Sequence, residues 1–250
     1  MAGRLISGRR FSENGMNTTL SPTDIVGASF WLLSIAMIAA AIFFLAERNR
    51  VEGKWQTAVT LAATVMVIAA VHYFYLKDMW VATGQAPIVL RYVDWALSRP
   101  IQVVSFFILL SAVTSLSTAL FWRLLVGALV TVVAEFLGSA GYMSVTLGFL
   151  IGMVGWLYVL GELYLGEAST ANAGSGHERS QMAFTSLRLI VTIGWAIYPL
   201  GYFMQHLAGG VDVNTLNVIY NFADILNKLI FGLVIYKAAV DSAERERGAQ

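Results

Sequence analysis

The sequence predicts an all-α membrane protein, a bundle of seven transmembrane helices with its N-terminus on the extracellular side. Composition is the first reason: 58% of the 250 residues are hydrophobic and 12% are charged, whereas soluble domains carry about 25% charged residues. The second is that apolar stretches of about 20 residues, the length that crosses a bilayer, recur between short polar breaks. The third is that no segment alternates apolar and polar residues over about ten positions, as the strands of a membrane barrel do.

The apolar stretches, taken in order, define the predicted helices. They cover residues 24–47, 55–76, 88–112, 120–141, 144–166, 181–207 and 214–240. The longest break, residues 166–180, is rich in Gly, Ser and Ala and predicts a flexible loop. The predicted organisation is therefore an extracellular segment 1–23, one helical domain 24–240 and a cytoplasmic tail 241–250.

The distribution of basic residues predicts the orientation, because cytoplasmic loops carry an excess of Lys and Arg. With the N-terminus outside, nine basic residues lie on the inner side: Arg48, Arg50, Lys54, Arg123, Arg179, Arg188, Lys237, Arg245 and Arg247. Four lie on the outer side: Arg4, Arg9, Arg10 and Lys77. The imbalance favours an extracellular N-terminus.

Composition excludes several classes of function. The chain has no cysteine, which excludes disulfides, thiolate metal sites and cysteine nucleophiles. A net charge of +1, without a basic block interleaved with aromatic residues, gives no indication of nucleic-acid binding. No nucleophile and base occur at a spacing that would support acid–base hydrolysis. We therefore expect neither an enzyme nor a metal site.

Lys228 is the first candidate functional residue because it lies in the middle of the last apolar stretch. A lysine at the centre of a membrane helix costs roughly 2.5–3.5 kcal/mol on insertion scales, so a chain that keeps one normally uses it. Asp224 lies four residues earlier, on the same helix face. Its carboxylate can offset the buried positive charge.

Other charged residues also fall within the predicted helices and define a buried polar axis. They are Arg91, Asp94, Arg99, Glu135 and, near a helix end, Glu162. Spacings of three and four place Arg91, Asp94 and Ser98 on one face of the third helix. Asp94 is therefore a second carboxylate that is available to Lys228.

Short segments in several helices carry a family resemblance. They are Ser29-Phe-Trp-Leu32, His72-Tyr73, Arg91-Tyr-Val-Asp-Trp95, Leu124-Leu-Val-Gly127, Gly194-Trp-Ala-Ile-Tyr-Pro-Leu-Gly-Tyr-Phe203 and Ile219-Tyr-Asn-Phe-Ala-Asp-Ile-Leu-Asn-Lys228. In these segments the chain resembles the microbial rhodopsins, and specifically the outward proton pumps of the proteorhodopsin type. The resemblance extends through nearly the whole chain.

The resemblance implies that Lys228 carries all-trans-retinal as a protonated Schiff base. It also implies that Asp94 and Asp224 are counterions and that Asp94 is the primary proton acceptor. A positive nitrogen among apolar side chains keeps its proton only with negative charge nearby, and Arg91 keeps the cluster near neutral. Light would let the nearest carboxylate take the proton, and vectorial transfer requires reprotonation from the other side. The alternative is a structural Lys228–Asp224 ion pair, although an apolar pair would usually be no less stable.

The resemblance also implies a rigid aromatic slot around the polyene. The residues at matching positions are Tyr92, Trp95, Trp195, Tyr198, Pro199 and Tyr202, and Pro199 is expected to bend the sixth helix. Without the resemblance, such aromatics would more simply serve packing or the membrane interface. Gln102 stands where relatives vary between leucine and glutamine, and its amide predicts absorption at shorter wavelengths. Phe149 stands where carotenoid-binding relatives have glycine, so no carotenoid antenna is expected.

His72 stands where proteorhodopsins place a histidine against the acceptor aspartate. An imidazole hydrogen-bonded to Asp94 would couple the two titrations and make the acceptor pH-sensitive, whereas a satisfied core histidine is the simpler alternative. Trp31 matches the residue that contacts this histidine across protomers in the family. The resemblance thus implies a ring-shaped homo-oligomer in the lipid bilayer, with a pentamer as the expected form.

Two serines depart from the family pattern. Ser98 replaces threonine and keeps a hydroxyl near the acceptor. Ser105 replaces the carboxylate that returns a proton to the Schiff base in the pumps, and a hydroxyl is no proton reservoir near neutral pH. We therefore expect reprotonation through water from the cytoplasm, or from another acid such as Glu162. Candidate release groups on the outer side are Glu13, Asp78, His206 and Asp212.

Arg99 is the most unusual residue, a permanent cation inside the third helix that needs a partner. Glu135 in the fourth helix lies at a compatible depth, and we expect an Arg99–Glu135 pair in the cytoplasmic half. The pair would either gate the entry of water or hold the two helices together.

Taken together, the sequence predicts a light-driven outward proton pump in a bacterial inner membrane. Asp94 is the predicted acceptor, and Ser105 leaves the pump without a carboxylate donor. A photosensor is one alternative, because sensory relatives also lack this donor, and a light-gated proton channel is another. His72, Asp94 and the absence of a signalling domain favour transport.

Overall fold

The computed structural model describes residues 19–248, and these residues form helices and loops without a strand. Seven helical spans are long and apolar enough to cross a membrane. In chain order they are Ile25–Arg50, Gly53–Thr83, Ile88–Ser111, Thr118–Ser139, Val145–Gly174, Glu178–His206 and Val213–Arg245, the first to seventh spans. The predicted seven-helix fold is confirmed.

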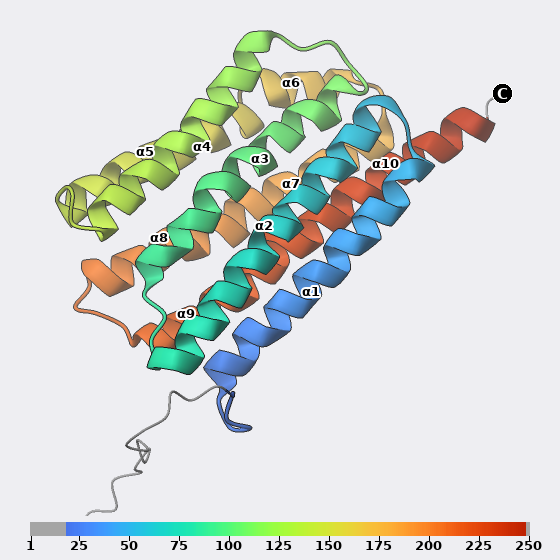
Figure 1. Ribbon diagram of the computed structural model, residues 1–250. Helices are drawn as coiled ribbons and strands as arrows, with labels where there is room; N and C mark the ends of the chain where they lie inside the picture. The colour runs from blue at the N-terminus through green and yellow to red at the C-terminus, as the bar shows by residue number, and fades with distance from the viewer. Residues whose placement is uncertain (1–18, 249–250) are drawn as a thin grey trace, which may run out of the picture.

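The spans are assembled from α-helices and short segments of other helix types. The α-helices are α1 (Ile25–Glu47), α2 (Gly53–Thr83), α3 (Tyr92–Ser111), α4 (Thr118–Ser139), α5 (Val145–Tyr164), α6 (Glu167–Gly174), α7 (Glu178–Leu189), α8 (Trp195–His206), α9 (Val213–Asp224) and α10 (Phe231–Gly248). The 3-10 segments are η1 (Arg48–Arg50) and η2 (Ile88–Arg91), and the π-helical segments are η3 (Ile190–Gly194) and η4 (Ile225–Ile230). In Figure 1, α1, α2 and α10 run together along one side of the bundle, and α4 and α5 form a pair at the other.

Side-chain caps explain where several helices begin. A side-chain oxygen accepts a hydrogen bond from a backbone N–H of the first turn at Asp24, Ser117, Ser144 and Asp212. Such caps satisfy donors that have no partner within the helix. Between the caps, many large apolar side chains remain exposed on the outside, among them Ile42, Val71, Val126, Val154 and Leu200. A surface of this kind is suited to contact with lipid tails.

The segment 166–180 is largely helical, so the prediction of a flexible loop was wrong. It contains α6 and the first residues of α7. Glu167 accepts hydrogen bonds from the backbone N–H and the hydroxyl of Ser117, at 2.8 and 2.6 Å, and pairs with Arg123 at 2.7 Å. The Gly and Ser content indicated a loop, but these contacts with α4 hold the first turn of α6 in place.

Two helices continue beyond their predicted ends because polar contacts stabilise the extra turns. α2 reaches Thr83, and near this end the indole N–H of Trp80 donates to Asp24 at 2.5 Å. α10 continues past residue 240, where Asp241 pairs with Arg179 at 2.7 Å. Hydropathy alone could not reveal either extension, because both turns are polar enough to lie outside the membrane.

Candidate functional site

Lys228 lies at the centre of a buried ion cluster. Its Nζ donates a hydrogen bond to Asp224 Oδ2 at 2.7 Å and another to Asp94 Oδ2. All three residues are at most 2% exposed. Asp224 ends α9 and Lys228 lies in η4, whereas α3 brings in Asp94 from 134 residues away. The structure thus brings together the lysine and both aspartates that the sequence singled out.

The two aspartates have unequal surroundings. Besides Lys228, Asp224 accepts hydrogen bonds from the Tyr73 hydroxyl at 2.6 Å and from the Tyr198 hydroxyl. Asp94 accepts one from Lys228, and its Oδ1 has no hydrogen-bond partner in the part of the chain that the structure describes. Hydrogen bonds to a carboxylate stabilise its charged form. Asp224 therefore holds its negative charge more firmly than Asp94 does.

Arg91 lies beside this cluster without forming an ion pair with either aspartate in the described residues. Its Nη2 donates to Asn217 Oδ1 at 2.9 Å and to Asn221 Oδ1 at 2.5 Å. Asn221 Nδ2 in turn donates to Ser29 Oγ at 2.7 Å. These residues form a polar network at the end of the bundle where α1, α3 and α9 begin.

The sequence reasoning missed Tyr73, Asn217 and Asn221 as site residues. A signal existed for the two asparagines, because residues 217, 221, 224 and 228 follow helical spacings along one face. Tyr73 carried no such signal. Its contact with Asp224 joins the second span to the seventh, and only the packing of the bundle creates it.

The predicted pocket residues come from two facing helices and are all buried. They are Tyr92, Trp95 and Gln102 from α3 and Trp195, Tyr198, Pro199 and Tyr202 from α8. The rings of Trp95 and Tyr198 meet across these helices with centroids 4.8 Å apart. From α5, Phe149 stacks on Tyr202 with centroids 6.0 Å apart. Of the predicted aromatic residues, Tyr198 contacts the ion cluster directly, through its hydrogen bond to Asp224.

Arg99 and Glu135 form the predicted ion pair between α3 and α4. Arg99 Nη1 lies 3.0 Å from Glu135 Oε2, and both residues are 3% exposed. The guanidinium carbon also lies 4.6 Å from the ring centroids of both Trp95 and Tyr198. Cation–π contacts with these rings add to the single hydrogen bond from Glu135. The pair thus joins α3 to α4 beside the aromatic residues, and both alternatives, holding the helices together and gating water, stay open.

Charge reversal tests the Arg99–Glu135 pair. The single changes Arg99→Glu and Glu135→Arg each bury two like charges together, and we expect each to destabilise the protein by about 3–5 kcal/mol. The double change should restore most of the loss, as thermal unfolding would measure. Single variants that melt like the wild type would contradict the helix-holding role. Altered dark-state recovery in a stable double variant would support a gate instead.

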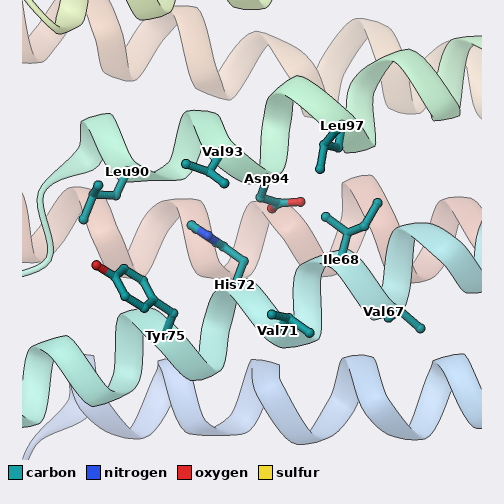
Figure 2. A pocket seen from close by; sticks show the side chains of 9 residues that line it. All are labelled: Val67, Ile68, Val71, His72, Tyr75, Leu90, Val93, Asp94 and Leu97. Carbon is teal, nitrogen blue, oxygen red and sulfur yellow. The ribbon is translucent and has the colours of Figure 1, made fainter.

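His72 does not form the predicted hydrogen bond with Asp94. Its Nε2, like Asp94 Oδ1, lacks a hydrogen-bond partner among the residues described, and Asp94 Oδ2 accepts from Lys228. Both residues line a groove of about 570 Å³ between the second and third spans (Figure 2). The remaining lining residues are apolar or aromatic: Val67, Ile68, Val71, Tyr75, Leu90, Val93 and Leu97.

The two serines that depart from the family pattern are both buried on α3. Ser98 lies one turn after Asp94, and its hydroxyl makes no hydrogen bond within residues 19–248. The Ser105 hydroxyl donates to the Ile101 carbonyl of its own helix at 2.9 Å. Apart from Gln102, apolar side chains border the space between Ser105 and Lys228: Ala62, Val65, Met66, Phe231 and Ile235. None of the described residues brings a carboxylate to this space.

The other titratable residues named from the sequence form no hydrogen bond or ion pair with Lys228 where the structure describes them. Glu162 pairs with Arg123 at 2.9 Å near the end of α5. Asp212 caps α9, and the backbone N–H and hydroxyl of Thr215 hold the pKa of this carboxyl below its ordinary value. Asp212 therefore stays ionised at neutral pH and is a poor proton reservoir. Asp78 is exposed and His206 is half-buried, whereas Glu13 lies outside the described residues.

The central residues fit an aldehyde-bearing polyene. Lys228 offers a buried primary amine, and the aspartates beside it can balance a positively charged nitrogen on that amine. Trp95 and Tyr198 place buried aromatic rings beside this cluster, and rings of this kind can pack against a conjugated chain. The chemistry of this residue set is therefore suited to a covalently bound retinal.

Comparisons with known proteins agree with this geometry. Residues 24–242 match the family model of bacteriorhodopsin-like proteins. The chain is 45% identical over 223 residues to the blue-light absorbing proteorhodopsin of Gamma-proteobacterium Hot 75m4, and the match covers 88% of each chain. It is 41% identical over 239 residues to the green-light absorbing proteorhodopsin of Gamma-proteobacterium EBAC31A08, with 95% of each chain covered.

Solved structures show the same similarity. The blue light-absorbing proteorhodopsin from Med12 has a TM-score of 0.75 and 39% identity, with 88% of this chain and 100% of that chain covered. The rhodopsin of Exiguobacterium sibiricum has a TM-score of 0.79 and 30% identity, with 88% and 97% covered. These relatives are rhodopsins, and the expectation that the chain is not an enzyme is confirmed. The chain belongs to the bacteriorhodopsin-like family and is a microbial rhodopsin.

Proposed function

We propose that the chain is a light-driven outward proton pump with all-trans-retinal bound covalently to Lys228. Family membership implies a retinal chromophore and a multi-pass membrane protein. The observation that carries the proposal is the buried contact of Lys228 with two aspartates whose hydrogen bonding is unequal. When bound, the chromophore supplies a protonated Schiff base whose hold on its proton weakens on illumination.

Asp94 is the proposed proton acceptor. Its Oδ2 contacts Lys228 Nζ, so the distance for a proton transfer is short. Asp224 remains ionised as the second counterion, because two tyrosine hydroxyls donate to it. Arg91 contributes a fixed positive charge. Together with the positive nitrogen on Lys228, this charge balances the two negative carboxylates. The unequal contacts therefore support different roles for the two aspartates.

The direction of transport is supported by the unequal polarity of the two ends of the bundle. From Asp94 and Asp224, the network of Arg91, Asn217 and Asn221 continues toward the end where α1 begins. On the other side of Lys228, the rings of Phe106, Phe184 and Phe231 pack together with centroids 5.5 and 5.9 Å apart. Hydrogen-bonding groups can conduct a proton and apolar rings cannot. Release toward the N-terminal side is therefore favoured.

We propose that this side is extracellular, as the basic residues indicate. Three of the four basic residues counted on the outer side, Arg4, Arg9 and Arg10, lie outside the described residues. The division into an extracellular segment 1–23, a helical domain 24–240 and a cytoplasmic tail 241–250 stays a prediction. The location of the protein in a bacterial inner membrane also stays a prediction.

The groove at His72 and Asp94 supports a homo-oligomer. The groove is apolar apart from these two residues and the hydroxyl of Tyr75, and Trp31 on α1 is 41% exposed. We propose that Trp31 of a second copy contacts His72 and that copies close into a ring, with five as the expected number. Mass measurement in mild detergent should give an oligomer that Trp31→Ala weakens, and a monomeric wild type would contradict the proposal.

Two properties of the pigment belong to the same proposal. Absorption at shorter wavelengths is supported by the buried amide of Gln102, which donates to the backbone carbonyl of Asn227, the residue before Lys228. The similarity to blue-absorbing relatives supports it as well. The expectation of no carotenoid antenna is supported by Phe149, whose ring covers Tyr202.

Recovery of the dark state should depend on external protons because Ser105 cannot donate one. We expect slow recovery at alkaline pH that accelerates as pH falls and on addition of azide, as flash absorption would measure. Ser105→Glu should accelerate recovery at alkaline pH by roughly 10²-fold and flatten the pH dependence. Ser105→Ala is the matched control and should behave like the wild type. Wild-type recovery that is flat with pH and insensitive to azide would contradict this prediction.

Illumination of intact cells tests the function itself. A pump produces sustained acidification of the medium that an uncoupler abolishes. A passive current whose sign reverses with membrane voltage would indicate a proton channel instead. Neither response, in cells that contain the coloured protein, would indicate a photosensor.

A further inference from the structure

Two π-helical segments face each other in the sixth and seventh spans. They are η3 and η4, and they pack together next to the ion cluster. A π-helical turn displaces backbone carbonyls from the regular hydrogen-bond pattern and often marks a functional position. The seventh-span segment contains Lys228 itself, preceded directly by Asn227. Asn227 therefore lies between the backbone of the chromophore lysine and the sixth span.

The side chain of Asn227 joins the two segments. It is 1% exposed, and its Nδ2 donates to the Gly194 carbonyl at 2.9 Å and to the Tyr198 hydroxyl at 2.9 Å. Because Gly194 offers an acceptor and Tyr198 already donates its own hydrogen to Asp224, both partners require an N–H donor. The amide orientation is thus determined by its neighbours, and both of its hydrogens are used.

Gly194 permits this close approach. A Cβ atom at this position would lie 3.0 Å from Asn227 Cγ, closer than packed carbon atoms tolerate. On the opposite side, Gln102 Nε2 donates to the backbone carbonyl of Asn227. Asn227 is therefore held by the third and the sixth spans at once.

The hydrogen bonds continue from Asn227 to the counterion. Tyr198 accepts from Asn227 and donates to Asp224, which also accepts from Lys228. A hydroxyl that accepts a hydrogen bond becomes a stronger donor, because a chain of hydrogen bonds polarises its members. Asn227 thus strengthens the hydrogen bond that Tyr198 gives to Asp224.

We propose that Asn227 is a positioning residue that couples the facing π-helical segments of the sixth and seventh spans to the counterion Asp224 through Tyr198. It orients the Tyr198 hydroxyl and so helps Asp224 to keep its negative charge. The proposal rests on the proposed function, because its effect is read from the bound chromophore. It assigns a role to a residue whose hydrogen bonds go to Gln102, Gly194 and Tyr198 rather than to Asp94 or to the side chain of Lys228.

The experiment is a spectrophotometric acid titration of the visible band. Asp94 is first replaced in Asp94→Asn, so that the acid transition reports Asp224 rather than a coupled pair. The titratable and charged groups around Asp224 come from the second, third, sixth and seventh spans: His72, Tyr73, Arg91, Asp94, Tyr198 and Lys228.

Adding Asn227→Ala should move the acid transition to higher pH by about half to one unit, the size expected for one weakened hydrogen bond. In a background that also carries Tyr198→Phe, Asn227→Ala should move it by less than a third of that shift, because the connecting hydroxyl is gone. Ser34→Ala removes a buried hydroxyl that bonds only to its own helix, and it should leave the transition unmoved.

A transition that does not move in Asn227→Ala, or that moves equally with and without Tyr198, would overturn the proposal. Gly194→Ala provides a second variant should Asn227→Ala fold poorly. Its methyl group would collide with Asn227 Oδ1 and displace the amide from its present hydrogen bonds, including the one to Tyr198, so the transition should move in the same direction. A wild type and a Ser34→Ala variant that both form no visible band would instead refute the proposed function and leave no chromophore to titrate.

Discussion

Lys228→Ala is expected to abolish the visible absorption band that the wild-type chain forms with all-trans-retinal. Lys228 carries the buried primary amine between Asp94 and Asp224, and it is the one buried lysine in the described part of the chain. Alanine offers no amine for a covalent bond, so the loss should be complete rather than partial. The absorption spectrum of purified apoprotein after addition of retinal measures it.

Two controls separate the covalent bond from the ion cluster. Lys228→Ala leaves two carboxylates buried without their cation, and breaking a buried pair destabilises by about 3–5 kcal/mol. Lys228→Arg keeps the positive charge but has no primary amine, so it should fold better and still be colourless. Lys54→Ala removes an exposed lysine and should keep the full band. A band of wild-type strength in Lys228→Ala would refute the covalent linkage.

Asp94→Asn is expected to keep the visible band and to stop proton transport. A neutral amide cannot accept a proton, and loss of a general base in contact with its donor typically reduces the rate by roughly 10²-fold or more. Removing one negative charge from beside the positive nitrogen destabilises the ground state more than the excited state, in which the positive charge is spread along the polyene. The band should therefore shift to longer wavelengths. Light-induced acidification of cell suspensions, normalised to pigment, gives the transport rate.

The matched variants identify the acceptor among the two aspartates. Asp94→Glu keeps a carboxylate within reach and should retain part of the transport. Asp224→Asn removes the carboxylate that two tyrosines stabilise, and we expect transport to fall less than in Asp94→Asn because Asp94 still accepts. Full acidification by Asp94→Asn, or a greater loss in Asp224→Asn than in Asp94→Asn, would contradict the assignment of Asp94.

Features that depend on local spacing were predictable. The seven spans follow from runs of apolar residues, and the spacing of four places Asp224 beside Lys228 within one helix. The Arg99–Glu135 contact was predictable for a different reason. A guanidinium keeps its charge inside a membrane helix, so it must find an acid, and Glu135 lay at the right depth.

Features that depend on the rotation of one helix against another were not predictable. The sequence suggested a hydrogen bond between His72 and Asp94, whereas in the bundle Asp94 bonds to Lys228, and the two residues border the same groove without bonding to each other. A small rotation of either helix would decide between these two arrangements. The same holds for Tyr73, whose hydroxyl reaches Asp224 from another span.

By itself, the sequence determined the membrane fold and the identity of the buried charges, because hydropathy and helical spacing act along one chain. Its short motifs carried the family resemblance. The tertiary structure alone decided how hydrogen bonds are divided between Asp94 and Asp224, and how Asn227 joins two π-helical segments. These contacts connect residues from different spans. Their geometry depends on the packing of all seven helices, because a shift of a single ångström between helices makes or breaks a hydrogen bond.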